Sequence, residues 1–510
     1  MRAVWIGVLV AACGDQARPP GNAPPDATAF PEVVPACTTG AQTQTFDDAS
    51  AFGPVVAGTL AAWDPAGRWF LTGVALGDVS SVMLQRQADG TFMFDRSAVK
   101  VGTLTADSLF ERDEQTYNDK PYLEAHRISN LAPDGTLKLD RAQCYGGSCE
   151  VCTAKVVRAT HNTAGDVGGG VVGGVVEGEG DGLTMLGQLA GPSWGPGYTF
   201  NVRVAGTTAY LIRQDGLHII DTTDPTNPTQ LGLYRRAHLG YSNDVKLVDA
   251  NAKRYAVIAD YGVDVVDVSN PANPTLVATI PEDAHTDAIE ARDGKVYAYF
   301  GTYDGTCPIY DLTDPEHPAK LGQFAVNGML VHDLSIEHGI AYLNAWDQGF
   351  VVVDFTNPAA PVRLGAWSNT PTRTSHSNWT TTIDGRHIAL HGEESYGAKL
   401  DLVDVDPAAP GFMQSFATWQ TRPWVSIHNL MAFGTKAYFT YYQDGVRVLD
   451  LSDPTRPTQI GYFNTWDPQA DYTSSDFFEG AVGIDVDRAR HLVFVADSPR
   501  GLLILGDDTP

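Results

Sequence analysis

Apolar residues recur in a fixed order along the C-terminal two-thirds of the chain. Each copy has an alternating apolar run that ends in Asp, then a turn with two prolines, then a second short apolar run. The six copies read GLHIIDTTDPTNPTQLGLY, GVDVVDVSNPANPTLVATI, TCPIYDLTDPEHPAKLGQF, GFVVVDFTNPAAPVRLGAW, KLDLVDVDPAAPGFMQSF and GVRVLDLSDPTRPTQIGYF. Alternation of this kind predicts short β-strands, and the regular spacing predicts a structural repeat.

The polar positions of the repeat have a structural interpretation. The Asp residues that end the first run are Asp221, Asp267, Asp311, Asp354, Asp404 and Asp450, spaced 43 to 50 residues apart. An Asp or Asn precedes the first proline of each turn, and its side chain is expected to accept hydrogen bonds from backbone amides of the turn. Proline fixes φ there. These residues are therefore predicted to be structural, and the spacing is that of a four-stranded propeller blade.

A second repeating segment lies upstream of each copy and predicts a hairpin that begins with an inner strand. Seven such hairpins occur against six proline turns, because the last one runs to the chain end without an outer strand. The segment Leu183–Leu189 matches the outer-strand pattern. The sequence therefore predicts an all-β protein with a seven-bladed β-propeller over residues 183–510, closed by this N-terminal strand, so that no open sheet edge remains.

These repeats resemble the LVIVD repeat of bacterial and archaeal cell-surface proteins, with strands such as Val351–Asp354. The resemblance covers about residues 183–507. It implies a β-propeller at the cell surface, and it implies no particular reaction.

The N-terminus predicts export. Residues 1–12 have a short positive start and an apolar run, which is too short to span a membrane. The run ends in small residues followed by Cys13, which resembles the lipidation signal of bacterial lipoproteins; the alternative is an ordinary signal peptide with an incidental Cys. Gly14 after the lipidated residue favours the outer membrane, either periplasmic or surface-exposed. Residues 13–35 are rich in Pro and Ala and predict a tether.

Two further segments precede the propeller. Residues 36–163 combine short apolar runs with turn signals and predict a small β-rich domain, and the Gly-rich residues 164–182 predict a linker. Export implies an oxidising compartment. Disulfides are therefore expected among four cysteines, with metal binding as the alternative; they are Cys37, Cys144, Cys149 and Cys152.

The charge of the chain excludes one class of partner. The formal net charge is -27, and such a surface repels phosphate backbones, so we expect no nucleic-acid binding. The negative net charge is compatible with a membrane contact through the lipid anchor and with a protein or carbohydrate ligand.

Polar residues at the start of the inner strands are the candidate site. Four histidines fall at similar places in consecutive inner strands, with carboxylates beside them. The candidate ligands of a divalent metal in the channel are His285, His332, His376, His428, Asp287 and Asp333, and the candidate ligand-binding residues are Asn243, Asp244 and Glu479. Imidazole and carboxylate donors suit Zn, Cu, Fe or Mn. The alternative is structural, because polar residues at these positions also satisfy backbone groups, and strand alternation opposes a common direction for His285 and His332.

No complete catalytic motif accompanies these residues. The chain has no phosphate-binding Gly-rich loop, no H-E-x-x-H and no G-x-S-x-G. We therefore interpret the protein as a cell-envelope lipoprotein whose propeller is a binding or protein-interaction module. The alternative is a metal-dependent enzyme, a hydrolase or an oxidase, that uses the histidines and carboxylates of the channel mouth. A third possibility is a scaffold that only displays the N-terminal domain.

Overall fold

The computed structural model describes residues 36–54, 57–72, 81–94, 99–100, 102–117, 119–132, 135–159, 180–190, 194, 198–236, 243–368, 374–395, 398–422, 425–466 and 478–510. This part of the chain is built of strands, with one 3-10 helix, η2 (Ala49–Phe52). No helix within it has the length and apolar character needed to cross a membrane. Cys13, expected to carry the lipid, and most of the Gly-rich segment lie outside the described residues.

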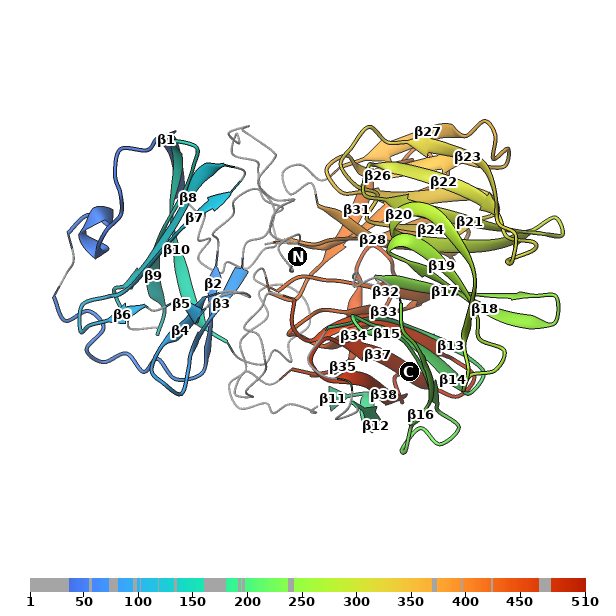
Figure 1. Ribbon diagram of the computed structural model, residues 1–510, viewed down its shortest axis with the longest axis horizontal. Helices are drawn as coiled ribbons and strands as arrows, with labels where there is room; N and C mark the ends of the chain where they lie inside the picture. Colours follow the sequence, from blue (N-terminus) through green and yellow to red (C-terminus); the bar gives the residue numbers. More distant parts are fainter. Residues whose placement is uncertain are drawn as a thin grey trace.

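The N-terminal strands form one strongly curved sheet, blue to teal in Figure 1. Its strands are β1 (Ala36–Ala41), β2 (Arg68–Thr72), β3 (Ser81–Arg86), β4 (Phe92–Phe94), β5 (Val99–Lys100), β6 (Thr103–Leu104), β7 (Leu109–Tyr117), β8 (Lys120–Ser129), β9 (Leu137–Tyr145) and β10 (Ser148–Arg158). The order is β5-β4-β3-β2-β10-β9-β8-β7-β6, with β1 on β10. Buried residues of β9 and β10 mostly alternate with less buried ones, in line with the two-residue period of a strand. An apolar cluster that includes Trp69, Leu84 and Leu139 packs on this sheet.

Two disulfides join strands of this sheet. Cys37 of β1 faces Cys152 of β10 and is bonded to it. Cys144 and Cys149 face each other across the β9–β10 hairpin and form the second bridge. All four cysteines are thus bonded within the sheet.

The rest of the chain forms four-stranded antiparallel units that run from an inner to an outer strand. The first four units comprise β13 (Thr199–Ala205), β14 (Thr208–Arg213), β15 (Gly216–Asp221) and β16 (Thr229–Tyr234); β17 (Asp244–Ala250), β18 (Lys253–Ala259), β19 (Tyr261–Asp267) and the first half of β20 (Thr275–Arg292); the second half of β20, β21 (Lys295–Thr302), β22 (Thr306–Asp311) and β23 (Ala319–Ala325); and β24 (Asp333–Glu337), β25 (Ile340–Ala345), β26 (Gly349–Asp354) and β27 (Val362–Trp367).

The later units comprise β28 (Ser375–Ile383), β29 (Arg386–Glu393), β30 (Leu400–Asp404) and β31 (Ser415–Trp419); β32 (Leu430–Phe433), β33 (Lys436–Thr440), β34 (Val446–Asp450) and β35 (Thr458–Phe463), with β11 (Gly180–Asp181) added at the edge; and β36 (Ala481–Asp487), β37 (Leu492–Asp497) and β38 (Gly501–Asp507), with β12 (Leu183–Leu189) as the outer strand. Strand β20 serves as the outer strand of one unit and the inner strand of the next.

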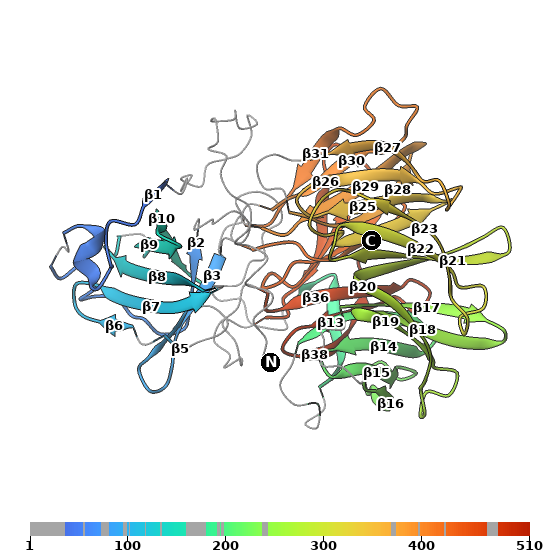
Figure 2. The same ribbon diagram turned by 45° about the horizontal axis from the view of Figure 1, so that its top comes forward.

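The units are arranged as a β-propeller. Each inner strand contacts the next in chain order, and β36 contacts β13, so the arrangement closes on itself (Figures 1 and 2). The expected closing pair is confirmed, because Leu183–Leu189 runs antiparallel to β38 with Leu183 opposite Asp507. Pairing the first strand with the last removes the free edge that the last unit would otherwise present.

The turns of the six copies have the expected hydrogen bonds. The Asp or Asn before each first proline accepts a hydrogen bond from the backbone amide two residues on; these residues are Asp224, Asn270, Asp314, Asn357, Asp406 and Asp453. Glycine in the outer strand has a packing role that the pattern alone did not explain. A Cβ at Gly232 would overlap the carbonyl oxygen of Pro271 in the next unit, and Gly187 and Gly322 meet Pro225 and Pro358 in the same way.

The curved N-terminal sheet packs against the propeller (Figure 2). Phe70 of β2 and Ala159 after β10 share an apolar cluster with propeller residues that include Trp419, Tyr442 and Trp466. Figures 1 and 2 show the sheet on one side of the ring.

Candidate functional site

The two ends of the propeller carry different residues. Because neighbouring strands of each unit run in opposite directions, the start of an inner strand and the proline turn lie at opposite ends. We call the end with the six proline turns the turn end. The other end, where the inner strands begin, is the histidine end.

The four candidate histidines form a continuous row at the histidine end. Ring centroids are 3.9 Å apart for His285 and His332, 4.1 Å for His332 and His376, and 4.5 Å for His376 and His428. Four residues from four separate strands or strand approaches are thus brought together, as the alignment of the inner strands predicted.

β-Bulges explain how residues at different strand positions come to lie in one row. The pairing register shifts between Ala284 and Thr286, and again between Ser375 and Ser377. His285 and His376 are the extra residues of these bulges, while His332 and His428 lie before the strands β24 and β32 begin. The strict alternation of a regular strand therefore does not apply to any of the four.

Hydrogen bonding divides the row into two pairs. Nδ1 of His285 lies 2.9 Å from the carbonyl oxygen of His332, and Nδ1 of His428 lies 2.9 Å from that of Val482. These two imidazoles connect one inner strand to the next, which is the structural use of polar residues that the sequence predicts as the alternative to a ligand site. The rings of His332 and His376 likewise lie near the backbone of the next histidine in the row. However, Nδ1 of His332 and both nitrogens of His376 have no hydrogen-bond partner among the described residues.

Glu394 joins the unpaired histidines. It follows β29, and its amide donates to the carbonyl oxygen of Thr374 at 3.1 Å. One carboxylate oxygen, Oε2, lies 3.7 Å from Nε2 of His376, and the hydroxyl of Tyr442 donates to the other. One ligand atom from each of His332, His376 and Glu394 lies within 4.8 Å of the other two. The alignment of inner strands did not reveal Glu394, although Glu393–Tyr396 is where the fifth copy departs from the repeat.

The surroundings keep the imidazoles neutral. Burial lowers the pKa of His285 to about 4 and that of His428 to about 4. Burial, and then the neighbouring histidines, hold the pKa of His332 and of His376 well below the usual value. Trp346 stacks on His332 with centroids 4.9 Å apart. Neutral imidazoles have a free lone pair, which is the form that binds metal ions.

The candidate carboxylates form a separate group along the inner strands. Thr286 donates to both Asp244, at 2.9 Å, and Asp333, at 3.1 Å, and Lys246 pairs with Asp244. Burial raises the pKa of Asp287 well above its usual value and that of Asp333 to about 6. Burial acts in the same direction on Asp244, but Lys246 and Arg203 outweigh it and lower the pKa. Asp287 and Asp333 are not in the group formed by His332, His376 and Glu394.

Asn243 supports an aromatic pair beside the row. Its side-chain amide donates to the hydroxyl of Tyr303 at 2.5 Å, and the Tyr303 ring meets His285 edge-on at 5.5 Å. Tyr261 stacks on Tyr303 with centroids 5.0 Å apart and planes 13° apart, and 47% of its surface stays exposed. The pair therefore offers a fixed aromatic surface at the histidine end.

Glu479 lies in the contact between the N-terminal sheet and the propeller. Its carboxylate pairs with Arg68 of the N-terminal sheet and accepts from Nε1 of Trp466 at 3.0 Å. Both charged side chains are almost fully buried. Arg422 forms a second buried ion pair, with Asp444 at 2.6 Å, and lies over the ring of Phe70. Arg68 gave no signal in the sequence, because its partner is 411 residues away.

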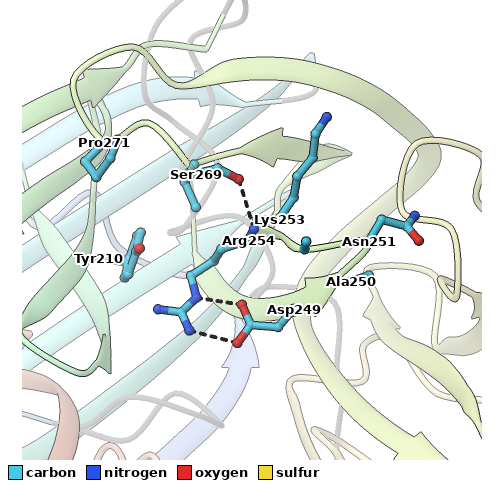
Figure 3. Close-up of a pocket in the computed structure, with 10 residues that line it drawn as sticks. Tyr210, Asp249, Ala250, Asn251, Lys253, Arg254, Ser269 and Pro271 are labelled. Carbon is cyan, nitrogen blue, oxygen red and sulfur yellow. Dashed lines mark hydrogen bonds and ion pairs between the residues drawn. The ribbon is translucent and has the colours of Figure 1, made fainter.

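A surface pocket at the turn end has different chemistry. It is lined by Tyr210, Asp249, Arg254 and Pro271, among others (Figure 3). Arg254 binds both carboxylate oxygens of Asp249, at 2.7 and 2.8 Å, so the charges of the pocket satisfy each other. The candidate site is therefore at the histidine end.

Comparison with known proteins supports the repeat. The profile described as "LVIVD repeat" matches residues 196–235, 240–280, 330–367 and 429–465, which cover the first, second, fourth and sixth units. The chain contains four LVIVD repeats. It is a β-propeller repeat protein. Two of the row histidines, His285 and His376, lie in units that the LVIVD matches do not cover.

Solved structures with some similarity include BamB from Moraxella catarrhalis, at 11% identity over 63% of this chain and 97% of that chain, with a TM-score of 0.39. The WD40 β-propeller domain of Doa1 has 13% identity over 64% of this chain and 97% of that chain, with a TM-score of 0.46. The computationally designed Ika8 protein has 12% identity over 63% and 98%, with a TM-score of 0.41. No curated protein sequence matches the chain.

Proposed function

We propose that this protein is a cell-envelope lipoprotein, anchored through Cys13, whose propeller has seven blades and acts as a binding or protein-interaction module. The inner strands support the blade number. They are β13, β17, the second half of β20, β24, β28, β32 and β36, and each contacts the next around the channel.

The observation that carries the proposal is the stacked pair Tyr261 and Tyr303. A large aromatic side chain exposed on a rigid scaffold is typical of binding surfaces, because little side-chain entropy is lost when a partner binds. Tyr303 is fixed by Asn243 and His285, and it holds Tyr261 in turn. The N-terminal sheet contacts the later units of the propeller, where Phe70 of β2 packs against Trp466. Tyr261 and Tyr303 instead belong to the second and third units.

The partner presents a ring or another flat apolar group to Tyr261. Both a protein side chain and the face of a sugar have this chemistry. The net charge of -27 disfavours nucleic acids and favours a partner without strong negative charge.

The test places a photoreactive benzoylphenylalanine at position 261 of the full chain, which is expressed with its own N-terminus in Gram-negative cells. Irradiation should give a discrete cross-linked species whose mass, and sensitivity to protease or glycosidase, identifies a protein or a glycan partner. The matched control carries the same residue at Asn227, an exposed position of the turn end. Equal cross-linking from both positions, or none from 261, would contradict the proposal.

The anchor is tested separately. Cells are fed a palmitate analogue, and incorporation is compared between the wild type and Cys13→Ser. Labelling and membrane fractionation of the wild type, with both lost in the variant, are expected. A wild type that stays unlabelled contradicts the lipoprotein assignment but leaves the interaction surface untouched.

A further inference from the structure

His376 is buried between the rings of His332 and His428. It is 1% exposed, and neither ring nitrogen has a hydrogen-bond partner among the described residues. A buried polar group without a partner costs about 1–3 kcal/mol. His285 and His428, in the same row, bind backbone carbonyls, so the row itself does not require an unpaired ring.

Glu394 is held with one carboxylate oxygen directed toward His376. Tyr442 occupies Oε1, and the backbone amide of Glu394 is bound by Thr374. Oε2 then faces Nε2 of His376 at 3.7 Å, which is too long for a hydrogen bond. Two histidines and one carboxylate thus converge with their ligand atoms within 4.8 Å, without bonding to each other.

We propose that His332, His376 and Glu394 bind one divalent transition-metal ion. Two imidazole nitrogens and one carboxylate oxygen suit Zn²⁺, Fe²⁺ or Cu²⁺ and not Ca²⁺ or Mg²⁺, which prefer oxygen ligands. Ligand atoms around a tetrahedral zinc ion lie about 3.3 Å apart, given bonds of about 2.0–2.2 Å.

The neighbours of the three ligands support the site. Tyr442 orients Glu394 from behind, as hydrogen-bonded groups orient metal-binding carboxylates. Trp346 stacks on the ring of His332, which is half-buried. With three protein ligands, at least one position on the ion stays open to water or a ligand. The site is independent of the proposed partner surface and of the lipid anchor.

The test uses the full, untagged chain, stripped with a chelator and titrated with Zn²⁺ in a calorimeter. The wild type should bind about one ion per chain. His376→Ala and Glu394→Gln should each weaken binding by at least about 10-fold. Glu394→Gln keeps the volume of the side chain, and the control His338→Ala removes a histidine that is 91% exposed and should bind as the wild type does.

Two further measurements keep the result interpretable. Far-UV circular dichroism of the metal-free proteins shows whether each variant is folded, and Co²⁺ should give visible absorption bands in the wild type and His338→Ala that are lost in His376→Ala. Zn²⁺ should also raise the unfolding midpoint of the wild type and of His338→Ala, and raise it less in His376→Ala and Glu394→Gln. Fewer than about 0.1 ions per chain, or unchanged affinity in folded His376→Ala and Glu394→Gln, would overturn the site.

Discussion

The turn end and the histidine end of the propeller differ in how their polar side chains are hydrogen bonded. At the turn end, every copy of the repeat places an Asp or Asn where backbone amides of its own turn satisfy it. At the histidine end, residue types change from unit to unit, and buried groups such as those of His376 and Asp287 lack hydrogen-bond partners among the described residues. Repetition therefore marks structural positions, and departure from it marks candidate chemistry.

The two ends also differ in how much a lost hydrogen bond costs, because their polar groups are buried to different extents. The turn hydrogen bonds are mostly exposed, so water replaces each of them at little cost. The charges and imidazoles of the histidine end are removed from water, where an unsatisfied group is costly. Changes at the histidine end should therefore have larger effects than changes at the turn end.

The largest effect is expected for Glu479→Ala. The substitution leaves the buried Arg68 charge without its carboxylate, which should lower the free energy of unfolding by about 3–5 kcal/mol, measured by denaturant unfolding. Replacing both partners together, as Arg68→Met with Glu479→Leu, should restore most of the loss. Glu316→Ala, which removes an exposed ion pair with Lys253, is the matched control and should leave stability unchanged. A loss no larger than that of the control would mean that the ion pair does not hold the N-terminal sheet.

A smaller, pH-dependent loss is expected from His391. Burial lowers its pKa to about 3, so the folded state keeps it neutral while the unfolded chain takes up a proton below about pH 6.5. The stabilisation is complete above pH 6.5 and is lost as the pH falls toward 3. At pH 4 the loss is on the order of 3 kcal/mol.

Unfolding curves at several pH values compare the wild type with His391→Gln, whose pH dependence should be shallower. Ile388→Val, in the same strand and fully buried, should lower stability equally at every pH. An identical pH dependence in wild type and His391→Gln would show that this imidazole does not contribute.

The smallest effect is expected at the turn end, for Gly232→Ala. The added Cβ would overlap the carbonyl oxygen of Pro271 and push two units apart, at a cost of about 1–3 kcal/mol in thermal or denaturant unfolding. Gly40→Ala, in β1 of the N-terminal sheet, meets no atom within 4 Å and should change stability by less than about 0.5 kcal/mol. Equal stability of the two variants would remove the packing explanation for the repeated glycine.

Much of the propeller could be predicted because its determinants are local and repeated. The proline turns and the β12–β38 closure follow from short segments that recur, and both are present. The position of the histidines also followed from the repeat. The bulges that align His285 and His376 with the others did not, because a bulge depends on pairing with the neighbouring strand.

Other contacts could not be predicted because they occur once and join distant segments. Glu394 lies in the least regular copy, so no aligned position pointed to it. Arg68 reaches Glu479 across 411 residues, and the pairing Cys37–Cys152 with Cys144–Cys149 was one of several connectivities that four cysteines allow. Such contacts depend on the folded arrangement and produce no repeating pattern in the sequence.

The closing strand has a consequence for how the molecule is made. Gln188 and Arg500 are 312 residues apart and hydrogen bond at 3.0 Å across the closure. Translation begins at the N-terminus, so β12 exists long before β38 and cannot form this pairing until β38 has been synthesised. A chain that lacks its final strand leaves both β12 and β37 with open edges, which favours aggregation and degradation. The closure therefore makes the ring depend on both segments: a chain that is truncated before β38 does not form it.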